Sequence, residues 1–290
     1  MKLEEWMRGV AELVFVPQCL ACGIRLESRL TDSRDCLAFC EKCEQSYRDA
    51  LFNSCAVCNR PLSECLCASD FMKKNGLSRL VKMFRYLPQD ANAVQNNLIY
   101  SLKRKRTRRA VEFCAKSLGG SVQRLVPHYE EWTVTFAPRS QKMRRYYGHD
   151  QSELIAMALA DYIALPYEDL LVRDKSAKVQ KELNRNERLA NMRGKYAVRR
   201  GIDLHGKKIL LVDDVVTSGA TMLAAAKALR RAGASAVIGV TVGIAYRQIT
   251  ALQINRMERK YALKEVKRLR RQRKHLKPVA AKREQTKEFE

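Results

Sequence analysis

The sequence predicts an α/β protein whose parallel sheet is flanked by helices, with a cysteine-rich module before the sheet and a basic tail after it. Residues 209–212 are an uninterrupted run of branched apolar side chains, typical of a strand that is buried on both faces. An alanine-rich helix over 221–232 and a second apolar run over 236–242 continue the alternation of a parallel α/β sheet. Nine of the ten cysteines lie between residues 19 and 67, which marks the module.

The chain opens with apolar residues at helical spacing, so we expect a short amphipathic helix over 1–16. No run approaches the ~18 apolar residues of a membrane span, and the N-terminus lacks the basic and apolar regions of a secretory signal. We therefore expect a cytoplasmic protein. The formal net charge of +24 favours polyanionic partners but does not choose among nucleic acid, phosphate-rich ligands and acidic surfaces.

The cysteine spacing predicts two metal sites in a double zinc ribbon over 17–70. Two cysteines two residues apart turn both thiolates toward one ion, and two such pairs complete a tetrahedral site. A disulfide framework is disfavoured in a cytosolic chain. An iron–sulfur cluster is less expected than zinc, because the sequence contains no Cys-x-x-Cys-x-x-Cys run. The expected zinc ligands are Cys19, Cys22, Cys40 and Cys43 in one site and Cys55, Cys58, Cys65 and Cys67 in the other, which leaves Cys36 and Cys114 over.

The α/β domain is expected over 71–246 and begins with a helical pattern. A brief extended piece at 83–86 precedes helices over 89–103 and 107–118, and a strongly basic run lies between the two helices. This run is either a solvated helix junction or a patch for the phosphates of nucleic acid, and the residues leave both interpretations open. Its candidate nucleic-acid residues are Lys103, Arg104, Lys105, Arg106, Arg108 and Arg109.

Three features separate this basic run from the central motif. Residues 133–137 alternate branched and small side chains and predict a strand. Asp150 is placed to cap the following helix, and Glu153 to reach back to the cap. Residues 173–200 hold ten Lys or Arg against three acids and have no clear period, which predicts a mobile loop.

The central motif, residues 206–221, predicts a strand, a turn and the start of a helix. Asp213 and Asp214 stand where the apolar strand run ends. The free N–H groups and positive dipole of a helix N-terminus bind anions, and Gly219 lets the backbone approach a phosphate. Carboxylates suit sugar hydroxyls or a divalent cation. A phosphorylated ribose meets these conditions, whereas the plain alternative is an ordinary turn whose polar residues cap a helix.

The run from Val212 to Thr221 resembles the phosphoribosyl-pyrophosphate (PRPP) signature of type I phosphoribosyltransferases. This resemblance implies that the acidic pair holds the ribose hydroxyls and that the loop after it holds the 5′-phosphate. Magnesium is then expected to bind together with PRPP. The residues expected to bind PRPP are Asp213, Asp214, Val215, Thr217, Ser218, Gly219, Ala220, Thr221 and Arg139.

The order of parts resembles the ComF family of competence-associated proteins, in which a double zinc ribbon precedes a phosphoribosyltransferase-like domain. Besides the central loop, this resemblance rests on the stretches 137–138, 148–151, 179–183 and 188–194. Two positions depart from the family pattern. Tyr147 stands where an arginine is usual, with Arg144 and Arg145 as substitutes, and Ser218 stands where threonine is commoner.

The resemblance implies a role in DNA uptake and transformation, in one of two ways. As an enzyme, the chain would be a phosphoribosyltransferase with an unidentified acceptor. The candidate catalytic residues are then Asp213, Asp214, Lys178 and Arg145. As a binding protein, it would sense PRPP or act as a scaffold, binding single-stranded DNA and a competence helicase or another DNA-processing protein. A purely structural zinc protein would leave the acidic pair unexplained.

The tail over 247–290 holds 15 basic and 5 acidic residues. It is either helical or disordered, and two interpretations stay open for its role. One is a solvated tail. The other is a basic arm that binds nucleic acid through phosphate contacts, without the interleaved aromatic residues that would stack on bases.

Overall fold

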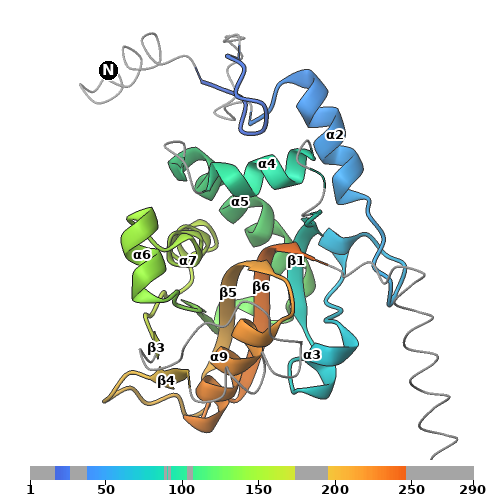
Figure 1. Ribbon diagram of the computed structural model, residues 1–290. Helices are drawn as coiled ribbons and strands as arrows, with labels where there is room; N and C mark the ends of the chain where they lie inside the picture. The colour runs from blue at the N-terminus through green and yellow to red at the C-terminus, as the bar shows by residue number, and fades with distance from the viewer. Residues whose placement is uncertain are drawn as a thin grey trace, which may run out of the picture. The chain divides into compact units, whose positions relative to one another are not determined.

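Figure 1 shows a computed structural model of the 290-residue chain, which describes residues 17–26, 38–87, 90, 93–102, 107–173 and 195–245. The expected helix over 1–16 and the expected tail over 247–290 lie outside these residues. The elements in chain order are α2 (Glu41–Leu51), the 3-10 helix η1 (Leu62–Glu64), α3 (Asp70–Lys74), β1 (Leu80–Arg85), α4 (Val94–Ser101), α5 (Thr107–Leu125), the 3-10 helix η2 (Tyr129–Glu131), β2 (Trp132–Phe136), α6 (Gln141–Tyr147), α7 (Gln151–Tyr162), β3 (Leu171–Arg173), β4 (Tyr196–Val198), β5 (Lys208–Val216), α9 (Ala220–Arg231) and β6 (Ala236–Ile244).

Strands β1, β6, β5 and β2 form, in that order, a four-stranded sheet in which every neighbouring pair is parallel. The central strands β5 and β6 are buried along almost their whole length, because helices cover both faces of the sheet. The parallel α/β class predicted from their apolar runs is therefore confirmed. Since all four strands run the same way, their carboxyl ends meet at one edge, where ligands of open α/β sheets bind.

Alternate side chains of β5 point to the two faces of the sheet. Leu210 and Val212 pack into one core with residues of α4, α5 and α7, whereas Ile209 and Leu211 pack into a second core with α9. Figure 1 shows α4 and α5 together, with α9 well apart from them. Burial on both faces explains why residues 209–212 of this strand are all apolar.

The cysteine-rich segment contributes to both of these cores. Cys19, Cys43 and Tyr47 belong to the core that contains α5, whereas Cys55 and Cys65 belong to the core that contains α9. The segment thus passes around the sheet at the edge formed by β1. The expected boundary at residue 70 stays a prediction, but the described cysteine-rich residues share the cores of the sheet rather than having one of their own.

Backbone hydrogen bonds fix this segment to the start of β1. The N–H of Leu80 donates to the carbonyl of Leu66 at 2.8 Å, and the N–H of Ala68 donates to the carbonyl of Ser78 at 3.4 Å. An edge strand otherwise presents unpaired backbone groups that can join another chain. The segment covers the first part of that edge.

The acidic pair lies inside β5 and not after it, contrary to our expectation. The strand continues to Val216, because β6 keeps pairing with it as far as the partners Val216 and Ile244. The apolar run at 209–212 marks only one part of β5, whose side chains are buried in the two cores, so it did not indicate where the strand ends. Asp213 and Asp214 are therefore held on a regular strand, which fixes their positions.

Two helices and one strand differ in length from the prediction. Helix α5 was expected to end at Leu118 but runs through two glycines to Leu125. A Cβ atom on Gly119 would lie 2.5 Å from Cδ1 of Tyr162, so this glycine permits the close packing of α5 on α7 instead of ending the helix. Strand β1 is longer than the piece expected at 83–86, and helix α4 is shorter than the one expected at 89–103.

Two local expectations were wrong. Asp150 does cap α7, but Glu153 does not complete the cap: its Oε2 accepts a hydrogen bond from Nη2 of Arg144 at 2.7 Å. Glu153 thus pairs with the charged Arg144 and not with the backbone N–H of the cap residue, as we had expected. Of the loop expected over 173–200, residues 174–194 lie outside the described residues, and 196–198 form the strand β4, antiparallel to β3. None of the helices in the described part of the chain combines the length and apolarity that a bilayer span requires.

Candidate functional site

Two neighbouring carboxylates form the centre of the site at the carboxyl edge of the sheet. Asp213 and Asp214 are only 7% and 8% exposed. Oδ1 of Asp213 accepts hydrogen bonds from the hydroxyl of Ser152 at 3.2 Å and from the N–H of Asp214 at 3.0 Å. Oδ1 of Asp214 accepts from the N–H of Val215 at 2.8 Å, and its Oδ2 binds the guanidinium of Arg139. Both side chains are thus oriented by neighbours rather than free to turn.

The two acids differ in their electrostatic surroundings. Burial, and next the adjacent charge of Asp214, raise the pKa of Asp213 well above its usual range. Asp214 has a cationic partner in Arg139, with which it forms an ion pair whose side chains are 17% and 11% exposed. The pair is therefore suited to hold one proton on Asp213 until a cation or a ligand that donates hydrogen bonds arrives.

Asp150 links this pair to the loop that follows β2. Its Oδ2 accepts the N–H of Arg139 at 2.8 Å, and its Oδ1 accepts the N–H of Ser152 at 3.2 Å. Burial raises the pKa of Asp150, although hydrogen bonds and nearby arginines lower it. From the sequence we expected only a helix cap. In the structure the same carboxylate positions Arg139 beside Asp214.

The 217–221 loop follows the acidic pair and ends at the N-terminus of α9. Gly219 is the N-cap residue with a φ of 77°, a conformation that glycine adopts without strain. Thr217 is exposed, and the half-buried Ser218 accepts the N–H of Ala220 at 3.4 Å. The loop therefore places hydroxyls and the first amides of a twelve-residue helix beside the carboxylates, the arrangement of an anion site.

Of the basic residues predicted for the site, only some lie beside the acids. Arg139 lies against Asp214 with its guanidinium carbon 5.7 Å from the ring centre of Tyr147. Arg144 is engaged by Glu153, and Arg145 is exposed on the same helix, with no contact to the acids among the described residues. Lys178 lies outside the described residues. Of the acids and cations predicted for this site, the structure thus brings together Asp213, Asp214 and Arg139.

Sequence reasoning missed three side chains at this site. Ser152 contacts both acids, and its only signal was a small polar residue two positions after a helix cap. The hydroxyl of Tyr196 donates to the carbonyl of Pro138 at 3.1 Å and so ties β4 to the loop before Arg139. Burial, then the hydroxyl of Tyr100, raise the pKa of Tyr86 to about 12, with a smaller effect from Asp214.

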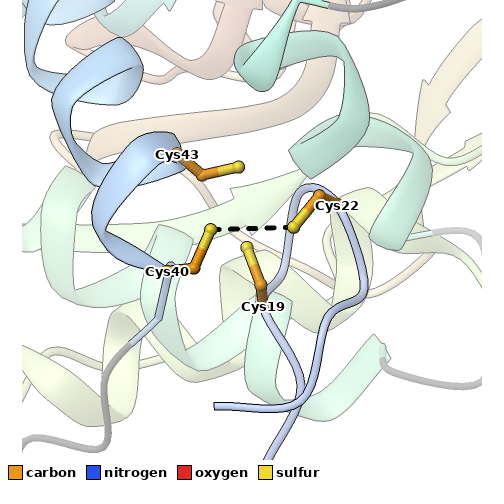
Figure 2. A group of neighbouring side chains, drawn as sticks. All are labelled: Cys19, Cys22, Cys40 and Cys43. Carbon is orange, nitrogen blue, oxygen red and sulfur yellow. Dashed lines mark hydrogen bonds between the residues drawn. The ribbon is translucent and has the colours of Figure 1, made fainter.

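The first set of predicted zinc ligands comes together around one point. Figure 2 shows Cys19 and Cys22 on one loop and Cys40 and Cys43 at the start of α2. All four sulfur atoms lie within 4.8 Å of one another, and the sulfurs of Cys22 and Cys40 are 3.7 Å apart. A tetrahedral Zn²⁺ with Zn–S bonds of about 2.3 Å requires sulfur separations of about 3.8 Å. The first set therefore fits a zinc ion.

The second set, Cys55, Cys58, Cys65 and Cys67, also has its four sulfurs within 4.8 Å. A backbone hydrogen bond from Arg60 is the main cause that lowers the pKa of Cys58 to about 6. The buried Lys82 donates from Nζ to the sulfur and to the carbonyl of Cys65, each at 3.0 Å. Donors of this kind stabilise thiolates, the form that binds metals. We did not expect Lys82, although a lysine inside an apolar strand run was a signal.

The remaining predicted groups are only partly described. Arg108 pairs with Glu112 at 2.9 Å, and Nη1 of Arg109 donates to the carbonyl of Gln18 at 2.8 Å. Arg109 thus helps to hold the first cysteine loop against α5. Residues 103–106 and Cys36 lie outside the described residues, and Cys114 is buried in α5. The nucleic-acid interpretation of this run stays a prediction.

Comparison with known proteins agrees with this geometry. Residues 150–262 match the model of the phosphoribosyl transferase domain. A stretch of 42 residues is 48% identical to adenine phosphoribosyltransferase of Mycobacterium avium, covering 14% of this chain and 23% of that enzyme. Over 105 residues the chain is 30% identical to the DNA utilization protein YhgH of Escherichia coli, covering 36% of this chain and 45% of that protein. The chain thus spans less than half of each relative.

Among solved structures, the purine phosphoribosyltransferase of Pyrococcus horikoshii is 15% identical, with a TM-score of 0.30 over 47% of this chain and 73% of that one. A likeness of this size supports no conclusion about the site. The matching domain model and the acidic pair on β5 carry the assignment. The described sheet and its helices therefore have a type I phosphoribosyltransferase-like fold, and residues 150–262 match the model of that domain.

Proposed function

We propose that the protein binds PRPP together with Mg²⁺ at the carboxyl edge of the sheet. The 217–221 loop receives the 5′-phosphate, Asp213 and Asp214 receive the ribose hydroxyls and the metal, and Arg139 faces the pyrophosphate. The observation that carries this proposal is the position of two buried, oriented carboxylates on β5, a few residues before the N-terminus of α9.

The donor set fits the metal, because Mg²⁺ prefers oxygen ligands and the two carboxylates supply them. When bound, Mg²⁺ would neutralise part of the pyrophosphate charge. Ligand entry also changes the present contacts of the site. Arg139 and the carboxylate of Asp214 satisfy each other in the structure, so a ligand must offer both groups a new partner.

Phosphoribosyl transfer at this site breaks the bond between C1′ and the pyrophosphate oxygen and forms a bond between C1′ and the acceptor. Pyrophosphate leaves with the bonding electrons, and positive charge develops on the ribose ring. Asp213 and Asp214 would stabilise that charge, and Arg139, Arg145 and Lys178 would stabilise the leaving group.

For the biological role, we propose a ComF-type competence protein that acts in DNA uptake and transformation. The order of a cysteine module and a phosphoribosyltransferase-like domain supports this role, as does the similarity to a DNA utilization protein. In this proposal both cysteine sets hold structural zinc ions. The partners are single-stranded DNA and a competence helicase or another DNA-processing protein.

A non-catalytic protein that senses PRPP or acts as a scaffold is the second candidate, and one observation favours it. A leaving pyrophosphate needs several free cations, but Arg139 is paired with Asp214 and Arg144 with Glu153, and Tyr147 stands where the family usually carries arginine. A site with fewer cations still binds PRPP but promotes its cleavage poorly.

Calorimetric titration with PRPP in the presence of Mg²⁺ tests the binding proposal. The wild type should bind, and Asp213→Ala and Asp214→Ala should each remove most of the affinity, because each deletes a carboxylate of the pair. Asp161→Ala is the matched control, since Asp161 is an exposed aspartate near the end of α7. Absence of binding to the wild type would rule out the proposed function.

A second measurement separates the enzyme from the scaffold. Release of pyrophosphate, abolished by Asp213→Ala while DNA binding stays intact, supports an enzyme. Transformation that survives in an Asp213→Ala strain supports a scaffold that does not need PRPP. Titration of single-stranded DNA at two salt concentrations tests the DNA contact, because affinity that depends on phosphate contacts falls steeply with salt.

A further inference from the structure

A methionine from the cysteine-rich segment lies directly against the 217–221 loop. Met72, on the short helix α3, is 1% exposed. A Cβ atom on Gly219 would lie 2.8 Å from Cγ of Met72 and 3.0 Å from its sulfur. Met72 therefore fills the space behind Gly219, the residue whose left-handed conformation starts α9. The loop cannot relax in that direction while Met72 stays in place.

The position of Met72 depends on the second cysteine set. Cys67 is followed by the buried Ala68 and then by Ser69, whose hydroxyl accepts the N–H of Met72 at 3.4 Å and caps α3. Cys65 belongs to the same core as Met72 and is bound to Lys82 of β1. A helix of five residues is not stable by itself, so the groups at its ends must hold it.

The far end of α3 is attached to α9. Gly76 accepts a hydrogen bond from the guanidinium of Arg230, and the N–H of Leu77 donates to the carbonyl of Met72 at 2.9 Å. Helix α3 therefore lies between the second cysteine set on one side and α9 on the other. The first cysteine set belongs to the other core, with α2 and α5, and serves as an internal comparison.

We propose that closure of the second cysteine set around a metal ion holds the 217–221 loop in its phosphate-binding conformation through Met72. The identity of the phosphate ligand rests on the proposed function, whereas the coupling itself does not. Met72 is a positioning residue in this scheme, because it touches the loop and not the ligand. Loss of metal from the second set then loosens the loop, and loss from the first set does not.

Hydrogen–deuterium exchange of the ligand-free protein tests the coupling without any phosphate ligand. Met72→Ala should speed exchange of the amides in 215–223 by about tenfold or more, because a cavity behind Gly219 lets the loop open. Met83→Ala is the matched control: Met83 is equally buried, but it lies in the other core. If both variants change the loop equally, or neither does, the proposal is overturned.

The metal dependence is tested by removing one ligand from each set. Cys67→Ser should speed exchange in 215–223, whereas Cys22→Ser should change it less than about twofold, since its set packs on the opposite face. Equal effects of the two variants would overturn the proposal. Should Met72→Ala fail to fold, Met72→Val, which removes fewer atoms, is measured in its place, and it too must loosen the loop.

Binding of ribose 5-phosphate gives the functional readout and separates the two proposals. Met72→Ala and Cys67→Ser should weaken the affinity for this probe about tenfold, while Met83→Ala keeps it, because only the first two changes disturb the loop that holds the phosphate. If the wild type binds neither this probe nor PRPP, but the loop loosens in Met72→Ala and Cys67→Ser as expected, the proposed function fails and the coupling stands. If the wild type binds PRPP but loop exchange and affinity are unaffected, the coupling fails and the function stands.

Discussion

At the scale of single residues, Asp213 shows the stability cost of a buried acidic pair. Its pKa is raised because the carboxyl is buried beside Asp214, so the folded protein resists ionising it. A protein optimised for stability alone does not need this arrangement, which is consistent with the proposed binding role of the pair.

Asp213→Asn should therefore stabilise the ligand-free protein, and the gain should grow with pH. The unfolded carboxyl titrates near pH 3.9, so the wild type loses stability as pH rises from about 4 through the raised pKa of Asp213. Asparagine has no such cost and keeps the oxygen that accepts from Ser152. Thermal unfolding at pH 5 and pH 8 measures this, with Asp161→Asn as the control. If the stability gain of Asp213→Asn became smaller as the pH rises, the pKa of Asp213 could not be raised by burial.

Lys82 is the second residue whose role follows from its contacts. It is completely buried and gives hydrogen bonds to the sulfur and the carbonyl of Cys65 and to the carbonyl of Leu80. A zinc ion with four thiolates carries a net negative charge, which a buried ammonium balances.

Lys82→Met should lower the zinc affinity of the second set by about 10- to 100-fold, the usual effect of losing a partner of a metal ligand. Competition with a chromogenic chelator measures it. Lys207→Met is the control, because Lys207 pairs with Glu168 at 2.8 Å and does not touch the cysteines. Unchanged affinity would mean that Lys82 only fills space beside the set.

At the scale of elements, the neighbouring glycines of α5 have opposite roles. A Cβ on Gly119 would lie 2.5 Å from a ring carbon of Tyr162 in α7, whereas a Cβ on Gly120 would approach only the flexible end of Arg124, at 3.3 Å. Both residues lie in one helix, so their helix propensities are the same.

Gly119→Ala should therefore destabilise the protein by about 1–3 kcal/mol through overpacking, despite the better helix propensity of alanine. Gly120→Ala should stabilise it by up to about 1 kcal/mol, because only the propensity changes. Denaturant unfolding of the two variants measures the difference. Equal effects would show that α5 and α7 do not pack as closely as the structure indicates.

Much of the element order was predictable from the sequence, for identifiable reasons. The apolar runs of β5 and β6, the alanine-rich α9 and the paired cysteines are local patterns, and each lies where expected. The extension of β5 through Asp214 was not predictable, because pairing with β6 and not composition holds that part of the strand. The same applies to β4, whose three residues depend on β3.

The candidate site divides in a similar way. Asp213, Asp214 and the 217–221 loop are consecutive along the chain, so the sequence alone predicted their grouping. Ser152 and Tyr196 come from distant segments, and only the folded chain brings them to the acids and to the loop after β2. Contacts between distant segments leave no periodic signal in the sequence.

At the scale of the whole molecule, the cysteine-rich segment supports both layers of the sheet domain, since its residues lie in both cores. Removing the metal should then weaken the whole domain and not only the segment. Trp132 is a suitable reporter, because it lies on β2, at the edge of the sheet opposite β1.

In a Trp6→Phe background, Trp132 is the only tryptophan. A strong chelator should lower the midpoint of its thermal fluorescence transition by about 2–4 °C for each kcal/mol of metal-binding energy lost. Addition of zinc should restore the midpoint. If the chelator releases metal but leaves the midpoint of the Trp132 transition unchanged, the cysteine-rich segment is an independent domain. That is the organisation that the expected boundary at residue 70 implies.

The pairing of β1 with β6 also has a consequence for biosynthesis. In the register, Leu80 lies opposite Gly239, so the strand that follows the cysteine-rich segment lacks its partner until almost the last described residue has left the ribosome. At translation rates of about 5–20 residues per second, that delay lasts roughly 8–30 s. During this time β1 lacks its sheet partner, and the cysteine-rich segment, which is made before it and bonds to its start, is the described neighbour that can cover it.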